Sequence, residues 1–176
     1  MENPLERYAE LLRRWAGRLD LVAPGDLERL EERHIADCLR LAPLLDELPD
    51  GPCADVGSGA GLPGVLLAIV RPERPWRLIE PRRRRAAFLE EVIRELGLTC
   101  EVVVATAADA ARDPGLAGSH AAVTARAVAP SEHAMAAVLP LVAPGGAGVV
   151  FIGESGAPPA ESEEWAPGIA IIRVDR

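Results

Sequence analysis

Four glycines fall within eight residues of this chain, at positions 57, 59, 61 and 64. They follow a short apolar segment, residues 53–56, and an apolar run with helical spacing begins near position 63. Glycine is needed where the backbone takes a positive φ or passes close to a ligand. A strand, a glycine-rich turn and a helix in this order predict a turn that wraps around a bound small molecule. The fold must therefore be one in which the end of a strand opens onto a ligand site.

Strand and helix patterns alternate along the chain after position 53. The expected strands are 53–56, 76–80, 100–105, 120–125, 147–152 and 169–174, and the expected helices are 63–70, 82–96 and 131–142, with a short helical piece after 105, a turn at 144–146 and a loop over 153–168. Such alternation predicts a mostly parallel sheet covered by helices. In these sheets ligands bind beyond the carboxyl ends of the strands, at the point where the strand order reverses.

Two helices are expected before the first strand. Apolar residues at helical spacing predict one helix over 3–18 and another over 26–48. Asp26 is able to cap the second helix, and Pro43 is able to divide it.

The composition is that of an ordinary globular protein, with 176 residues of which 49% are apolar and 26% charged. We expect one compact α/β domain, in which N-terminal helices (1–48) pack on a Rossmann-like core (49–176). No apolar run approaches the roughly 20 residues that span a bilayer, and the N-terminus lacks a signal-peptide pattern. Three well-separated cysteines argue against disulfides or a metal site, so we expect a cytoplasmic protein that contacts no membrane.

The glycine turn leaves more than one ligand open. Residues 59–64 also satisfy the G-x-G-x-x-G pattern of dinucleotide sites, which is weak evidence alone. Asp55 precedes the turn, where a carboxylate suits the sulfonium and ammonium of S-adenosylmethionine better than a pyrophosphate. Glu80, at the end of the second strand, can bind the ribose hydroxyls of either ligand. The pattern favours the methyl donor over a dinucleotide, and both over a tight turn without a ligand.

Residues 55–68 (DVGSGAGLPGVLLA) resemble the signature of the RsmG or GidB family, the bacterial 16S rRNA guanine-N7 methyltransferases. The Leu-Pro-Gly after the glycines is more specific than a generic methyltransferase turn. Further similarities follow the family's order at 33–39 (RHIADCL), 78–80 (LIE), 84–89 (RRAAFL), 123–127 (VTARA) and 144–146 (PGG). The resemblance covers roughly residues 5 to 153.

The resemblance implies a class I, Rossmann-like methyltransferase fold with an N-terminal helical extension. It implies S-adenosylmethionine as methyl donor, S-adenosylhomocysteine as product, and 16S rRNA or the small ribosomal subunit as partner of a monomeric enzyme. Gly57 and Leu62 would contact the donor, Ala107 and Ala108 would border the adenine, and Arg126 would lie near the donor or the target base. Together with the pattern, this gives the candidate donor residues Asp55, Gly57, Ser58, Gly59, Gly61, Leu62, Glu80, Ala107, Ala108 and Arg126.

Three polar residues are candidates for positioning the substrate. His34 and Asp37 lie three apart on one expected helix, so they can pair or face the ligand site together. Arg126 follows the fourth strand, at the carboxyl edge. The alternatives are a surface pair for His34 and Asp37, and a structural ion pair for Arg126.

Arg82, Arg83, Arg84 and Arg85 form an arginine run at the start of an expected helix. The formal net charge of −8 argues against a general nucleic-acid binder, but local charge can overrule it. Cations at a helix N-terminus oppose the helix dipole, so another demand is expected to keep them there. They are candidates for contact with RNA phosphates, the alternative being a solvated face that pairs with Glu90 and Glu91.

The chain departs from the family pattern at three places. The family's N-L-T-A is Asp20–Ala23 here, its R-x-E is Thr106–Ala108, and its lysine before Gly153 is Ile152. Two alternatives therefore stand beside rRNA methylation: a methyltransferase acting on a small molecule or protein, and a donor-binding domain that has lost activity. If guanine N7 is the target, its lone pair needs no obligatory catalytic residue, because catalysis is mostly alignment of donor and acceptor.

Overall fold

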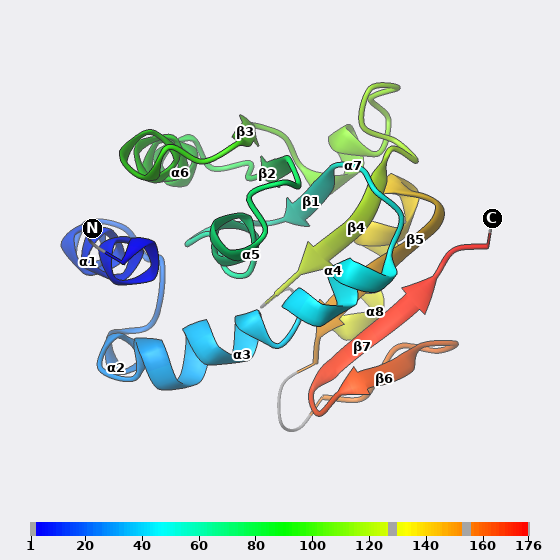
Figure 1. Cartoon of the computed structure of the whole chain (residues 1–176), viewed down its shortest axis with the longest axis horizontal. Helices are drawn as coiled ribbons and strands as arrows, with labels where there is room; N and C mark the ends of the chain where they lie inside the picture. Colours follow the sequence, from blue (N-terminus) through cyan, green and yellow to red (C-terminus); the bar gives the residue numbers. More distant parts are fainter. Residues whose placement is uncertain (1–2, 127–129, 153–155, 176) are drawn as a thin grey trace.

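The computed structural model describes residues 3–126, 130–152 and 156–175. A seven-stranded sheet in the order β3-β2-β1-β4-β5-β7-β6 forms its centre (Figure 1). The strands are β1 (Cys53–Val56), β2 (Trp76–Ile79), β3 (Cys100–Val103), β4 (His120–Ala125), β5 (Val142–Phe151), β6 (Glu163–Ala166) and β7 (Ile169–Arg173). β1 to β5 run parallel, and β7 pairs antiparallel with both β5 and β6. The mostly parallel sheet predicted from the alternating pattern is confirmed.

Helices cover both faces of this sheet. They are α1 (Pro4–Ala16), α2 (Pro24–Leu27), α3 (Ala36–Leu39), α4 (Ala42–Glu47), α5 (Gly64–Val70), α6 (Arg83–Leu96), α7 (Ala107–Ala110) and α8 (Ser131–Val138). Alternate residues of β1 enter different cores: Cys53 packs with α1, α5 and α6, whereas Ala54 and Val56 pack with α7 and α8. This period of two is the geometry of a strand buried on both faces.

The region predicted as one helix over 26–48 is broken into several pieces. α2 is followed by a π-helical segment (Leu30–Ile35), α3 and α4, and Pro43 lies in the first turn of α4 as a divider. The capping prediction for Asp26 is wrong, because Ala23 is the residue that precedes α2. The Asp26 carboxylate instead lies 3.7 Å from the Arg33 guanidinium and 3.5 Å from Nε2 of His34.

Three further boundaries differ from the prediction. Residues 163–166, predicted as loop, form edge strand β6. The strand pattern was missed because an edge strand needs few apolar residues, and two of these four are glutamates. β5 begins at Val142, because the Pro-Gly-Gly segment is a bulge inside the strand: Gly145 N–H donates to the Val174 carbonyl at 2.9 Å. Helix α8 ends at Val138, before a 3₁₀ turn that contains Pro140. Ala127 and Gly153, quoted above for the family similarity, lie outside the described residues.

The N-terminal helices and the sheet share one buried cluster. Helix α1 lies beside α6 (Figure 1), and its Leu11 and Leu12 are buried with Phe88 and Leu89 of α6. Trp15 meets the Phe88 ring edge-on, with centroids 6.2 Å apart. None of the helices among the described residues combines the length and apolarity needed to cross a bilayer.

Replacing Leu12 by alanine tests whether the two regions fold as one unit. The side chain is 0% exposed, so Leu12→Ala is expected to lower the free energy of unfolding by about 2–5 kcal/mol. Urea unfolding followed by circular dichroism and tryptophan fluorescence is expected to give one coincident transition. Glu6→Ala, on the exposed side of α1, is the control and should change stability by no more than about 1 kcal/mol. Two separate transitions, with only one shifted by Leu12→Ala, would contradict a single domain.

Candidate ligand site at the carboxyl edge of the sheet

The site is set by the register of four parallel strands. Val56 of β1 pairs with Ile79 of β2 and with Ala125 of β4, and Ile79 pairs with Val103 of β3. All four strands therefore end at the same level, and the segments that follow them open at one edge. The strand order reverses between β1 and β4, which is the place where open α/β sheets bind ligands.

The glycine turn that follows β1 needs its glycines for two different reasons. Gly57, Gly59 and Gly61 have φ values of 68°, 51° and 87°, a region that L residues rarely adopt. Gly64 instead permits close packing, because a Cβ there would lie 2.7 Å from Cβ of Asp55 and 2.7 Å from Cδ2 of Leu78. Gly57 is exposed, whereas residues 58–64 are buried. The turn thus presents Gly57 to the open edge.

The carboxylate of Asp55 lies beneath the turn and holds it from inside. It accepts hydrogen bonds from the hydroxyls of Thr124 at 2.7 Å and Ser58 at 2.9 Å, and from Gly64 N–H at 3.3 Å. The residue is 1% exposed, and burial raises the pKa of its carboxyl to about 6 despite these donors. Asp55 therefore stabilises the strand-turn-helix junction directly.

Glu80, the residue after β2, joins the turn to helix α6. Its Oε2 accepts from Gly59 N–H at 2.9 Å, and its Oε1 accepts from Arg82 N–H at 2.8 Å. A carboxylate offers about four acceptor positions, so two bonds leave roughly half of its capacity for other donors. The prediction of an acid at the end of the second strand thus corresponds to a carboxylate that touches the glycine turn.

The structure brings Arg126, His34 and Asp37 together from distant parts of the chain. The Arg126 guanidinium donates to Nδ1 of His34 at 2.9 Å and lies 3.4 Å from Oδ2 of Asp37. It also donates to the thiol sulfur of Cys38 and stacks over the Phe151 ring, 5.0 Å from its centroid. Sequence reasoning missed these last two partners. Cys38 follows His34 by four positions, so helical spacing could have indicated that both face Arg126. No sequence pattern indicates the contact between Phe151 and Arg126.

Burial controls the protonation of this cluster. Removal from water lowers the pKa of His34, and the nearby Arg126 charge lowers it further. A neutral imidazole can accept a hydrogen bond at Nδ1, as the bond from Arg126 requires. Burial also raises the pKa of the Cys38 thiol to about 12, so it remains protonated at neutral pH. Arg126 thus faces neutral acceptors and one carboxylate, Asp37.

The remaining candidates occupy three kinds of position. Ala107 and Ala108 begin α7 after β3, where the Thr106 hydroxyl caps the helix by accepting from Asp109 N–H at 3.1 Å. Leu62, in contrast, packs in the core on the α5 side. The arginine run, Arg82–Arg85, lines a cavity of about 380 Å³ at the start of α6.

Comparisons with known proteins agree on one family. A family model described as rRNA small subunit methyltransferase G matches residues 1–166. A protein of Acidothermus cellulolyticus named ribosomal RNA small subunit methyltransferase G is 45% identical over 140 residues, which are 80% of this chain and 60% of that protein. A protein of the same name from Mycolicibacterium gilvum is 37% identical over 173 residues, 97% of this chain and 75% of that protein. The chain thus spans only 60% of the Acidothermus relative, and 57% of another from Kineococcus radiotolerans.

Solved structures at lower identity confirm the class I methyltransferase fold. A Corynebacterium glutamicum protein superimposes with a TM-score of 0.66 at 15% identity, covering 97% of this chain and 90% of that chain. The C-terminal domain of precorrin-6Y C5,15-methyltransferase from Rhodobacter capsulatus gives 0.52 at 23% identity, covering 65% and 60%. Geranyl diphosphate methyltransferase in complex with S-adenosylmethionine gives 0.54 at 21% identity, covering 74% and 56%.

The buried Asp55 carboxyl predicts a specific pH dependence of stability. Its folded-state pKa of about 6 exceeds the value of roughly 4 in an unfolded chain, so the folded state binds this proton more tightly. Its contribution to stability is therefore fully present below about pH 4 and is lost as the pH rises through about 6. Compared with Asp55→Asn, the wild type should lose on the order of 2–3 kcal/mol of relative unfolding free energy over this window. Urea titrations of both proteins from acidic to neutral pH measure the difference; a relative gain would mean that the hydroxyl donors outweigh burial.

Proposed function

This chain belongs to the GidB family, the rRNA small subunit methyltransferase G proteins, and on that premise we propose that it methylates small-subunit ribosomal RNA. The proposed reaction transfers a methyl group from S-adenosylmethionine to N7 of a guanine in 16S rRNA. One observation carries the proposal: the strand register places the glycine turn, Glu80 and Arg126 at one edge of the sheet.

The residues at this edge suit the methyl donor. Glu80 retains acceptor capacity for the two ribose hydroxyls. Gly57 is exposed and lacks a Cβ, so a ligand can approach its backbone closely. Ala107 and Ala108, at the start of α7, would border the adenine with small side chains. The buried members of the predicted donor set would act by fixing the turn: Asp55, Ser58, Gly59, Gly61 and Leu62.

Methylation of guanine N7 depends more on the alignment of donor and acceptor than on proton transfer. N7 of guanine carries an in-plane lone pair, so no proton has to leave before it attacks a methyl group. The bound donor supplies a methyl group made electrophilic by its sulfonium. The protein contributes by holding both reactants in line and by excluding water between them. The proposal therefore needs neither an obligatory catalytic residue nor a metal.

Arg126, with His34 and Asp37, would position the guanine. An arginine side chain has five N–H donors; the contacts of Arg126 with His34, Cys38 and Asp37 all come from its two terminal nitrogens, which leaves Nε–H for a ligand. Its planar guanidinium can stack on a base or donate to base oxygens. His34 and Asp37 fix the guanidinium at the carboxyl edge of β4, so their role would be to orient Arg126.

A second candidate function keeps the methyl donor and changes the acceptor. It is favoured by the segment after β3, where Thr106 serves as a helix cap and no charged side chain stands at 106–108. A small molecule or protein would then be the substrate, or the chain would bind the donor without transferring its methyl group. The expectations of a cytoplasmic, monomeric protein stay predictions under either function.

Glu80→Gln tests the donor site. The substitution removes a carboxylate that would bind ribose hydroxyls, and hydrogen bonds to charged groups contribute about 1.5–3 kcal/mol. Affinity for S-adenosylhomocysteine in isothermal titration calorimetry should fall about 10- to 100-fold. Glu90→Gln, on the exposed side of α6, is the matched control and should bind like the wild type. An unchanged affinity in Glu80→Gln would place the donor elsewhere.

Methyl transfer tests the acceptor. Small ribosomal subunits from a bacterium that lacks the corresponding methyltransferase are incubated with the protein and donor carrying a tritiated methyl group. Label is expected in the small-subunit RNA, and borohydride reduction followed by aniline should cleave the RNA at the labelled nucleotide, as N7-methylguanine requires. Donor binding without label in RNA would favour the second candidate function.

A further inference from the structure

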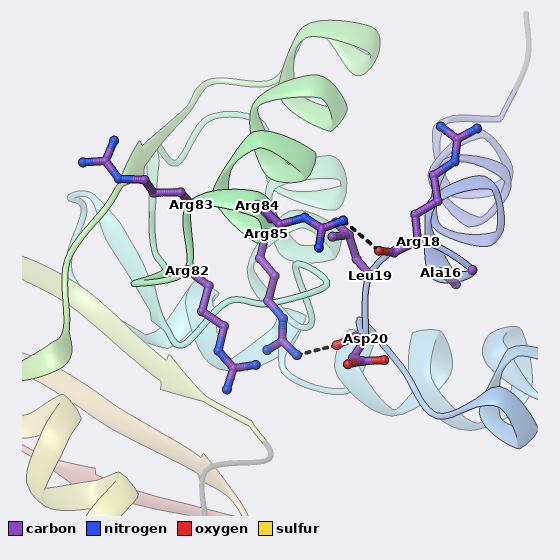
Figure 2. A pocket seen from close by; sticks show the side chains of 9 residues that line it. Ala16, Arg18, Leu19, Asp20, Arg82, Arg83, Arg84 and Arg85 are labelled. Atoms are coloured by element: carbon purple, nitrogen blue, oxygen red, sulfur yellow. Dashed lines mark hydrogen bonds between the residues drawn. The ribbon is translucent and has the colours of Figure 1, made fainter.

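A cationic cavity lies outside the proposed donor and base positions. It occupies about 380 Å³ between residues 16–20, which follow α1, and residues 82–85, which begin α6. We call it the arginine pocket. Figure 2 shows Arg84 and Arg85 reaching toward residues 18–20, Arg82 running alongside Arg85, and the Arg83 side chain pointing away.

Within the described parts of the chain, the four arginines 82–85 form no ion pair, and Asp20 is the one acid that lines the arginine pocket. Arg84 donates to the backbone carbonyl of Arg18 at 3.2 Å, and Arg85 donates to that of Asp20. These acceptors are neutral. Glu91, a partner considered for the run, instead bonds to Arg14 at 2.6 Å. Several arginines elsewhere have carboxylate partners, as Arg71 has in Asp46 at 2.8 Å, although Arg74 also bonds only to backbone carbonyls. In a chain with a formal net charge of −8, this concentration of unpaired cations indicates an anionic ligand.

The N-terminal end of α6 is a second feature that favours a bound anion. The helix begins at Arg83, and no side chain caps its first turn among the described residues. Unpaired N–H groups and the helix dipole both favour negative charge at this end, so the arginines oppose the dipole as they stand. Glu80 already places one carboxylate at this end, where it accepts from Arg82 N–H, but it forms no ion pair with the arginines. A phosphate would compensate the guanidinium groups and would also suit the helix end.

The pocket also borders the proposed donor site. Glu80 accepts from Arg82 N–H with one carboxylate oxygen and from Gly59 N–H with the other. A single side chain therefore connects the arginine pocket with the glycine turn of the donor site. A polymer with its phosphate in the pocket would therefore pass beside the edge where the methyl group is transferred. A free phosphate ion would gain nothing from this placement.

We propose that the arginine pocket binds backbone phosphates of single-stranded RNA, next to the nucleotide that is methylated. Arg82 is the principal phosphate contact, since its guanidinium has no ion-pair partner among the described residues and lines the pocket. Arg84 and Arg85 use one donor each to hold residues 18–20 and offer the others to the phosphate. This inference deepens the proposed function and rests on it for the identity of the polymer.

The test is the salt dependence of RNA binding by the full chain. A fluorescein-labelled 12-nucleotide single-stranded RNA is titrated with protein at several salt concentrations, and anisotropy gives the affinity. Each phosphate contact contributes about 0.7 to the slope of log affinity against log salt. Arg82→Gln should reduce the slope by about 0.7 and weaken binding about fivefold at 0.1 M salt; Arg82→Gln with Arg84→Gln should reduce it by about 1.4 and weaken binding about 25-fold.

Two controls keep the test specific. Arg94→Gln with Arg112→Gln removes two charges from side chains that are 69% and 76% exposed outside the pocket, and it should leave the slope close to that of the wild type. Arg82→Gln retains the backbone N–H that binds Glu80, so S-adenosylhomocysteine affinity should stay unchanged and report an intact fold.

The outcomes separate this inference from the proposed function. A slope unaffected by Arg82→Gln, or equally affected by the distant double variant, would overturn it. Displacement of the RNA by inorganic phosphate at constant ionic strength would also overturn it, because the pocket would then be a small-anion site. Donor binding without RNA binding would contradict RNA binding by the arginine pocket and would still support the proposed donor site. RNA binding that depends on Arg82 without methyl transfer would support the pocket and reject the reaction.

Discussion

The glycine turn after β1 is held by hydrogen bonds from three separate parts of the chain. Asp55 binds it from beneath, through Ser58 and Gly64 N–H. Glu80 binds Gly59 N–H from the neighbouring strand. The buried Tyr8 hydroxyl of α1 donates to the Ala60 carbonyl at 2.7 Å. A turn of three glycines at positive φ has many other conformations open to it, so the shape of the site depends on these contacts.

Two carboxylates near the turn have different tasks, and their hydrogen-bond partners distinguish them. Asp55 is enclosed, and its hydrogen-bond partners are all internal. Glu80 is also buried but binds only backbone N–H groups at the edge, so it alone of the two is suited to reach a ligand.

The N-terminal region also has two roles. It packs against α6 through a shared core, and its His34, Asp37 and Cys38 hold Arg126 at the end of β4.

Much of this architecture could be predicted from residue patterns, because parallel strands and their crossover helices are apolar segments that alternate regularly along the chain. The glycine cluster and the acid at position 80 could also be predicted as site residues, because each follows directly after a predicted strand. Strand β6 was missed because its two leading residues are glutamates at a sheet edge. The capping prediction for Asp26 failed because α2 starts earlier, at Pro24. The inward direction of the Asp55 carboxylate and the Tyr8 bond to Ala60 depend on tertiary packing, which local sequence does not encode.

The central claim is that the donor lies at the carboxyl edge, between the turn after β1 and the segment after β3. The most direct measurement is a two-dimensional amide NMR titration of the ¹⁵N-labelled chain with S-adenosylhomocysteine. We expect chemical-shift changes at Gly57, Gly59, Glu80, Ala107 and Ala108. We expect none at Ser119 and His120, where β4 begins at the opposite edge of the sheet. Changes concentrated at that opposite edge, or no changes with millimolar ligand, would contradict the central claim.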